Sequence, residues 1–431
     1  MFHARWRLYL NAYLFCLLTL LLFQKANGAT YVGAGGSRSI DAVVHPVGYD
    51  GSGGELIVTI GLHQSFAHLA SDIDFSANQT VAIWNNLIAT TGNLKPSVEI
   101  PAIGGTDVFG VLIHEVGHAL GLAHPTIQVS GLGDAATSTT GLNQVLDIGP
   151  GVDALLGTAD DVRGDDISLN YFNTADNNPF TLPASGIIDS TSYSRDITKL
   201  PAGDRYPVIG HRDVASSGYM LENTMAIMTS GGSLIPGLVR RGLVADDVAG
   251  IRYAMSGLDE IQGTSDDYTI KLVYVGVDSS ADIVIRFDRQ SGYAATGISA
   301  QPISGNHWRL RPGRVINYNP NLPNNRAWYF PVIESKRVEI RDASAASVNL
   351  RLATEAGKRY AIAWSPTLQE GSWSAREVSS EIGGKPIEKT GADFFLFIAE
   401  DEETIVNIDY LDTLSASAFF SAYQVLGKEL N

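Results

Sequence analysis

The residues best suited to chemistry in this chain lie between His114 and His124, in the order H-E-x-x-H-x-x-G-x-x-H. His114 and His118 are four residues apart, so a helix presents both imidazoles on one face, where they can hold two corners of a tetrahedral zinc site. Glu115 follows the first histidine, where a carboxylate can reach a water on the metal. The stretch therefore predicts a zinc-dependent hydrolytic site.

The glycine within this stretch has a mechanical role. Because glycine adopts a positive φ without steric cost, Gly121 lets the backbone leave the helix. His124 can then return as a third ligand, whereas a continuing helix would place it on another face. The alternative is a buried amphipathic helix with incidental histidines, since the stretch carries an apolar stripe of Val111, Leu112, Val116, Ala119 and Leu120. That stripe predicts burial but does not explain three histidines in register.

The segments before the histidines predict a small α+β unit. Apolar residues indicate strands at Ile40–Val47 and Leu56–Leu62, separated by a glycine-rich turn. A helix is expected next, with Ser76 and Gln79 as a capping box and Gly92 as its end.

A short strand and a helix cap connect this unit to the histidine helix. The strand is expected at Ser97–Ile103. Either Thr106 or Asp107 is expected to cap the helix by accepting a backbone N–H. No other strand fits between the two helices, so the sequence does not locate the rest of a sheet.

A long insertion follows the histidines. Residues 125–222 are rich in Gly, Asp, Asn, Ser and Thr with little periodicity, which predicts an acidic, loop-rich segment. Just beyond it stands the sequence A-I-M-T-S around Met228. A helix is expected at Leu243–Met255, because Asp246 and Asp247 suit its first turn and apolar residues follow at helical spacing.

Beyond residue 257 the sequence changes to short alternating segments separated by turns. These segments are Ile270–Val275, Asp282–Phe287, Trp308–Leu310, Val338–Ile340, Val348–Leu352, Tyr360–Trp364, Phe394–Ile398 and Ile405–Ile408. Many short strands predict an all-β, sandwich-like domain at 257–431. The expected organisation is a signal peptide at 1–28, an α+β domain at 29–256 and this β domain.

The N-terminus has the three parts of a secretory signal peptide. A basic start with Arg5 and Arg7 precedes a mostly apolar run from Leu8 to Phe23, and small residues around Gly28 suit cleavage. The alternative is an uncleaved membrane anchor, but an apolar run of about 16 residues is short for a span that needs about 20. We therefore expect bacterial export to the extracellular space, with no membrane association after cleavage.

Cysteine usage and charge narrow the chemistry further. The single cysteine, Cys16, lies in the signal, so the mature chain is expected to have neither disulfides nor a thiolate ligand. The formal net charge of −16 argues against nucleic acid and anionic membranes as partners. The same acidity is compatible with bound calcium.

An acidic motif occurs twice in the chain. Gly151–Asp161 and Gly257–Asp267 both read G-x-D-x-x-x-G-T-x-D-D. Carboxylates on short glycine turns suit calcium, which takes about six to eight oxygen ligands. The candidate ligands are Asp153, Asp160 and Asp161 in the first copy, and Asp259, Asp266 and Asp267 in the second. The alternative is a solvated turn in which Asp and Gly serve the backbone.

The complete motif from His114 to His124, followed by the segment around Met228, resembles the metzincin metallopeptidases. It is most similar to secreted bacterial matrixin-like proteins with a β-rich C-terminal extension. The resemblance implies an α+β catalytic domain, with a zinc helix under a small twisted sheet, a Met-turn and a C-terminal helix. It implies one catalytic Zn²⁺ on His114, His118 and His124. Met228 would lie in the Met-turn beneath the metal without bonding to it, with Met225 as the alternative.

The same resemblance implies a secreted zinc-dependent endopeptidase acting on protein or peptide substrates. A zinc-activated water would attack the peptide carbonyl with Glu115 as general base. One alternative is a non-catalytic binding or adhesion protein on the same scaffold, which an intact Glu115 disfavours. Another is a zinc hydrolase for a non-peptide bond. The family usually places several strands between the helix at Ser76–Gly92 and the zinc helix, where this sequence offers only Ser97–Ile103. The sequence therefore identifies neither the strand that would bind substrate nor the partner of the β domain.

Overall fold

The computed structural model describes residues 31–32, 42–90, 92–97, 99–123, 171–175, 181–194, 199, 226–228, 238–297, 299–343, 347–365, 381–382, 385–386, 388–389, 395–398, 402–409 and 419–430. The signal segment with Cys16, the ligand candidate His124 and the first acidic motif with Asp153, Asp160 and Asp161 lie outside these ranges, as does Met225. Within the described residues, no helix has the length and apolar character needed to cross a membrane.

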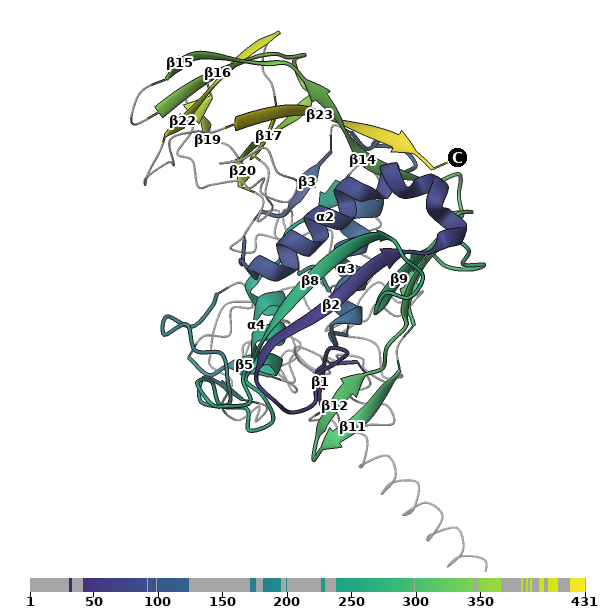
Figure 1. Cartoon of the computed structure of the whole chain (residues 1–431), viewed down its shortest axis with the longest axis vertical. Coiled ribbons are helices and arrows are strands. Elements are labelled where there is room, and N and C mark those ends of the chain that lie inside the picture. Colours follow the sequence, from purple (N-terminus) through teal and green to yellow (C-terminus); the bar gives the residue numbers. More distant parts are fainter. Residues whose placement is uncertain are drawn as a thin grey trace, which may run out of the picture.

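A five-stranded sheet forms the centre of the mixed α/β fold (Figure 1). Its strands are β2 (Gly54–Leu62), β8 (Tyr268–Val277), β9 (Ile283–Arg286), β10 (Ala294–Thr296) and β13 (Arg314–Tyr318), in the order β10-β13-β9-β2-β8. Neighbouring strands are parallel except at the edge, where β10 runs antiparallel to β13. The inner face buries Val58, Ile60 and Leu62 of β2, as the alternation in the sequence predicts.

This sheet joins distant parts of the sequence. One strand, β2, precedes the histidine helix, and the other four follow it by more than a hundred residues. The sequence left the rest of the sheet unlocated, and four of its five strands come from the chain after the histidine helix. The predicted boundary at 257 divides the strands of one sheet. The C-terminal sheets begin with β14 (Ala327–Lys336), which also pairs with β4 (Gly105–Asp107).

Three α-helices pack with the sheet: α2 (Ala70–Asn86), α3 (Val108–Ala119) and α4 (Ala245–Met255). Helix α2 lies against α3, β8 and β14, and α4 contacts β8. Trp84 fixes the contact between α2 and α3, because its indole is buried and donates to the carbonyl of Ile113 at 3.1 Å. The helix predicted at Leu243–Met255 is confirmed, with its start two residues later.

The first helix begins earlier than its capping-box motif predicts. A 3-10 turn at Gln64–Leu69 leads directly into α2 at Ala70, and both Ser76 and Gln79 are buried inside the helix. The prediction of a start at Ser76 was wrong, because Ile73 extends the buried apolar face by a further turn. The helix ends at Asn86, before the left-handed Leu87 (φ 47°), instead of at Gly92.

The prediction of a strand at Ser97–Ile103 was also wrong. Two short strands flank this segment, β3 (Leu94–Pro96) and β4 (Gly105–Asp107). Between them the Ser97 hydroxyl accepts from the backbone N–H groups of Glu99 and Ile100, at 3.2 and 3.1 Å. This local hydrogen bonding turns the chain and competes with an extended conformation.

Three smaller sheets complete the central part of the molecule. β1 (Val43–His45) lies within the strand predicted at Ile40–Val47 and pairs in parallel with β12 (His307–Leu310), which also pairs with β11 (Ala300–Ser304). β3 pairs with β7 (Leu238–Arg240), and β5 (Phe172–Asn173) pairs with β6 (Tyr193–Ser194).

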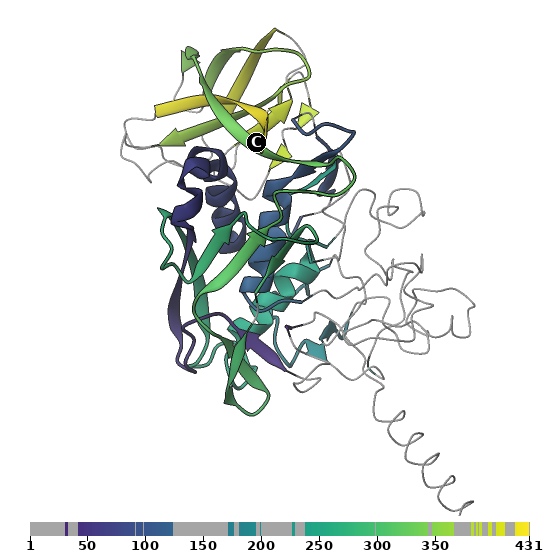
Figure 2. The same cartoon turned by 90° about the vertical axis from the view of Figure 1, so that its right-hand side faces the viewer.

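The C-terminal part contributes further β-sheets at one end of the molecule (Figures 1 and 2). A six-stranded sheet has the order β20-β21-β17-β23-β14-β4, and a three-stranded sheet has the order β15-β16-β22. The remaining strands are β15 (Val338–Ala343), β16 (Ser347–Ala353), β17 (Arg359–Ser365), β18 (Glu381–Ile382), β19 (Lys385–Pro386), β20 (Glu388–Lys389), β21 (Phe395–Ile398), β22 (Glu403–Asp409) and β23 (Phe419–Glu429). All eight alternating segments named from the sequence coincide with strands.

Candidate metal centre

The helix that carries the histidines begins at a side-chain cap. Asp107 is extended, and its carboxylate accepts from the N–H of Gly110 at 3.0 Å, so Asp107 is the N-cap of the two candidates. Val108, Leu112, Ile113 and Val116 are fully buried. The apolar stripe therefore fixes the rotation of α3 in the core, and that rotation sets where the histidines point.

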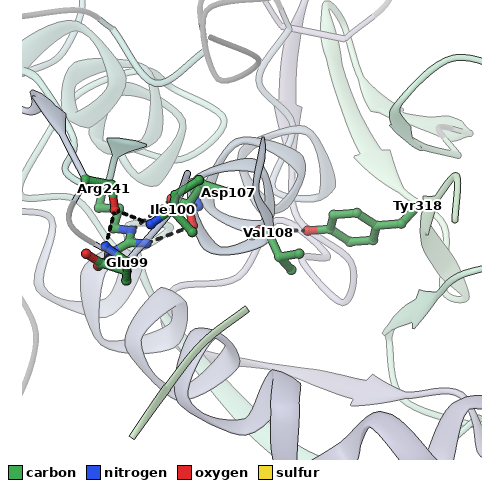
Figure 3. Close-up of polar contacts among 8 residues, drawn as sticks. Glu99, Ile100, Asp107, Val108, Arg241 and Tyr318 are labelled. Atoms are coloured by element: carbon green, nitrogen blue, oxygen red, sulfur yellow. Dashed lines mark hydrogen bonds and ion pairs between the residues drawn. The ribbon is translucent and has the colours of Figure 1, made fainter. Parts of the chain in front are cut away.

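A buried ion-pair cluster holds this cap in place (Figure 3). Nε of Arg241 lies 2.8 Å from Oδ2 of Asp107, and one of its terminal nitrogens lies 2.5 Å from Oε1 of Glu99. Burial disfavours the charge on Arg241, but the two carboxylates outweigh burial and raise its pKa. The guanidinium thus stays charged and links β4 to the segment after β7.

His114 and His118 are buried side by side on α3, with 6% and 9% exposure. Their ring centroids are 4.7 Å apart and the rings are nearly perpendicular, at 88°. Nδ1 of His114 lies 2.7 Å from the carbonyl oxygen of Ile227, and Nδ1 of His118 lies 2.8 Å from that of Leu122. A carbonyl can only accept, so each Nδ1 carries a proton, and in the neutral imidazole the lone pair is then on Nε2.

This tautomer is the one that a metal-binding imidazole needs. Metal-ligating histidines commonly donate their second ring N–H to a carbonyl or carboxylate, which orients the ring and raises its basicity. The donor chemistry of the two described imidazoles is therefore compatible with a zinc ion. Within the described residues, no group of three or more His, Cys, Asp or Glu side chains is close enough to hold a metal, and the third candidate, His124, lies beyond them.

Gly121 makes the turn that brings a carbonyl back to His118. Its φ is +117°, which confirms the predicted exit from the helix, and a Cβ there would lie 2.5 Å from the carbonyl oxygen of Val44. The N–H of Leu122 donates to the carbonyl of Gly117 at 3.0 Å. The backbone therefore turns directly after α3, and this turn brings the carbonyl of Leu122 to Nδ1 of His118.

Met228 packs directly under the histidine helix. Its side chain is buried, and a Cβ on Gly117 would overlap its sulfur and crowd the ring of Trp84. The glycine between Val116 and His118 therefore makes room for the methionine. The carbonyl of the preceding residue, Ile227, is the one that orients His114.

Two charged residues fix the backbone of this methionine turn. The carboxylate of Asp247 accepts from the N–H groups of Ile227 and Met228 at 2.8 and 3.1 Å, and from that of Val244 at 2.9 Å. Arg240 donates to the carbonyls of Ala226 and Ile227, each at 2.5 Å. Sequence reasoning placed Asp247 only in the first turn of a helix and did not single out Arg240.

Burial shifts the titration of both groups. It raises the pKa of Asp247 to about 6, against the opposing effects of the three backbone donors and of Arg240. It lowers the pKa of Arg240 to about 10, against the attraction of Asp247. Arg240 therefore remains charged at neutral pH, and the turn is held between opposite charges.

Glu115 lies between the two histidines in sequence and is also buried, with 5% exposure. Its Oε2 accepts a hydrogen bond from the Thr296 hydroxyl at 2.7 Å. Thr296 belongs to the edge strand β10, a region that sequence patterns assigned to a separate β domain. No local motif could have revealed this contact, because 181 positions separate the two residues.

The second acidic motif forms a closed turn. Asp266 accepts from the N–H groups of Leu258 and Asp259, at 2.6 and 3.2 Å, and from the hydroxyl of Thr264 at 2.7 Å. Burial raises the pKa of Asp266, but these hydrogen bonds outweigh it and leave the pKa below its ordinary value. Oxygens of Asp259 and Asp267 also lie 3.3 and 3.2 Å from the same hydroxyl. Calcium binding here stays a prediction.

Comparison with known proteins identifies no relative of this chain. No protein-family model matches, no curated protein matches and no solved structure matches.

Proposed function

We propose that this chain is a secreted zinc-dependent endopeptidase of metzincin type. The observation that carries the proposal is the pair of buried imidazoles side by side on α3, each with Nδ1 held by a backbone carbonyl, as the ring of a metal-binding histidine commonly is. His114, His118 and, by the sequence motif, His124 would hold the ion. When bound, zinc would make a water acidic and polarise a peptide carbonyl.

Glu115 supplies the base in this proposal. It follows the first proposed ligand on α3 and is nearly excluded from solvent. It would take a proton from the attacking water. The same carboxyl group would then give that proton to the leaving amine. A scaffold that only binds partners has no need of this carboxylate, so its presence favours an enzyme.

The positions of these groups are set before substrate arrives. Asp107 and Arg241 fix the start of α3, and Asp247 and Arg240 fix the turn whose carbonyl orients His114. Such preorganisation lowers the cost of reaching the transition state, because the groups need not reorient during the reaction.

The test uses the mature protein with casein and a quenched-fluorescent peptide library. We expect one zinc per chain and cleavage that a chelator abolishes and added zinc restores. Glu115→Ala should keep its zinc but lose activity by at least about 100-fold, the scale of general base catalysis. Glu55→Ala is the matched control, because Glu55 is half-exposed on β2 and pairs only with a surface lysine.

Two outcomes would contradict the proposal. If the wild type and Glu115→Ala both bind zinc and neither cleaves any peptide, the result would favour a binding or adhesion protein. Cleavage that persists in Glu115→Ala would place the catalytic base elsewhere.

A further inference from the structure

A single hydroxyl connects the edge of the central sheet to the proposed base. Thr296, the last residue of β10, places its Oγ1 2.7 Å from Oε2 of Glu115 and 2.9 Å from the backbone oxygen of the same residue. A threonine hydroxyl has one hydrogen to donate. It can therefore serve one of these two acceptors at a time.

The carboxylate is the stronger acceptor of the two. It is charged and closer, and the backbone oxygen of Glu115 already lies inside α3, where a helical N–H bonds to it. The hydroxyl hydrogen therefore belongs to Oε2 of the carboxylate. One of the two oxygens of Glu115 is thus held in place by the sheet.

The strand that carries Thr296 is itself firmly attached. Thr296 pairs with Ile316 of β13, and the next residue, Gly297, donates to the carbonyl of Val315 at 2.8 Å. Arg314 is nearly buried and donates to the carbonyl of Gly297 at 3.2 Å. These contacts keep β10 from moving away from β13.

Strand β13 is in turn attached to the histidine helix. The hydroxyl of Tyr318 donates to the carbonyl of Val108 at 3.2 Å, at the first residue of α3 (Figure 3). Burial, followed by the nearby charges of Glu115 and Asp107, raises the pKa of Tyr318 well above its ordinary value, so it remains a donor. The hydroxyl of Thr296 and the carboxylate of Glu115 therefore belong to one connected body.

We propose that Thr296 is a positioning residue for the base, which fixes Oε2 of Glu115 and leaves Oε1 to exchange protons at the reacting atoms. This inference rests on the proposed peptidase function. Without the hydroxyl, the carboxylate has more rotamers available, and fewer of them face the reacting water. The loss should therefore fall on kcat and leave KM nearly unchanged.

The test compares Thr296→Val, which keeps the branched shape, with Thr296→Ser, which keeps the hydroxyl. We expect Thr296→Val to lower kcat by about 10- to 100-fold with KM within about twofold, and Thr296→Ser to retain kcat within about threefold. Zinc content and melting temperature should stay close to those of the wild type. Thr269→Val is the control, because Thr269 is exposed on β8 at the opposite edge of the sheet.

Two further measurements separate positioning from a general structural effect. In the Glu115→Ala background, Thr296→Val should cause no additional loss of residual activity, because Thr296 acts through the carboxylate. Crystal structures of the two single variants at Thr296 should show the Glu115 carboxylate displaced or spread over several rotamers in Thr296→Val and unchanged in Thr296→Ser.

The outcomes distinguish this inference from the proposed function. If wild type cleaves peptides and Glu115→Ala does not, but Thr296→Val equals wild type, the inference fails and the function stands. If wild type shows no peptidase activity, the function fails, and the position of Glu115 in the Thr296→Val crystal still decides whether Thr296 fixes it. An unmoved carboxylate in that crystal would also overturn the inference.

Discussion

Gly117 shows how one residue inside the histidine motif serves packing. The position lies between two residues of the motif whose identities chemistry requires, and the sequence alone leaves it open. The structure places the Met228 sulfur and the Trp84 ring against its Cα, so a side chain has no room.

We expect Gly117→Ala to destabilise the protein by about 1–3 kcal/mol, the usual cost of overpacking a core. The measurement is the free energy of unfolding in urea. In the Met228→Ala background, Gly117→Ala should lower the free energy of unfolding by less than it does in the wild type, because the smaller residue leaves room for the added methyl group. If Gly117→Ala were more stable than the wild type, crowding by Met228 and Trp84 would be absent. Helix propensity, which favours alanine over glycine by about 1 kcal/mol, would then account for the change.

His45 is a second residue whose role depends on its surroundings. It is fully buried, with Nδ1 3.1 Å from the hydroxyl of Tyr268 and Nε2 2.9 Å from Nδ1 of His307. Burial, and next the charge of His307, lower the pKa of His45 to about 3. The folded protein therefore holds His45 neutral over most of the acid range, while the unfolded chain takes up a proton near pH 6.5.

The sign of the pH effect follows from this difference. Between pH 6.5 and about 3 the unfolded state binds more protons at this residue, so stability is lost as the pH falls, by about 1.4 kcal/mol per pH unit. Urea unfolding from pH 7 to pH 4 should show this slope in wild type and a shallower slope in His45→Asn. His68→Gln, at an exposed histidine, should leave the slope unchanged. An equal slope in His45→Asn would contradict the assignment.

At the scale of elements, the start of α3 depends on a buried ion cluster. Arg241 pairs with both Glu99 and Asp107, and its removal would take a buried positive charge away from these two buried carboxylates. We expect Arg241→Met to lower the free energy of unfolding by about 3–5 kcal/mol.

The matched control is Lys271→Met, which breaks the half-exposed pair with Glu55 at 3.4 Å. Solvent screens that pair, so the cost should stay below about 1 kcal/mol. Equal effects of the two variants in urea unfolding would show that the Arg241 cluster is not decisive for α3.

Element boundaries mark the limit of sequence patterns at this scale. The start of α3 and its exit at Gly121 were predicted correctly, because a side-chain cap and a positive φ are local properties. The start of α2 and the strand at Ser97–Ile103 were not. There, burial of Ile73 and the Ser97 hydrogen bonds outweigh the local motifs.

At the scale of the whole molecule, β14 connects the start of the histidine helix α3 to the C-terminal sheets. Its first residues pair with β4, directly before α3, and its remaining length pairs with β23. The half-exposed Lys428 of β23 also lies 2.7 Å from Asp72 of α2. The two parts share one strand, so we expect them to unfold together.

The prediction is that ending the chain after residue 416, which removes β23, lowers the melting temperature by at least about 5 °C. Calorimetry should show one transition in the full chain, and hydrogen exchange should show faster exchange along α3 in the truncated chain. Lys428→Ala removes the ion pair with the buried Asp72 but keeps β23, so it separates the cost of losing this pair from the cost of losing the strand. An unchanged α3 in the truncated chain would mean that the C-terminal sheets fold independently.

The features that could be predicted from the sequence are those that depend on residues close together in the chain. The spacing of His114 and His118, the position of Glu115 and the turn at Gly121 follow from helical periodicity and backbone sterics. The distant residues that surround this helix are known only from the fold. Thr296 contacts Glu115 across 181 positions, and Arg241 contacts Asp107 across 134. Such contacts leave no periodic pattern, because they arise only when the sheet and the buried core bring remote segments together.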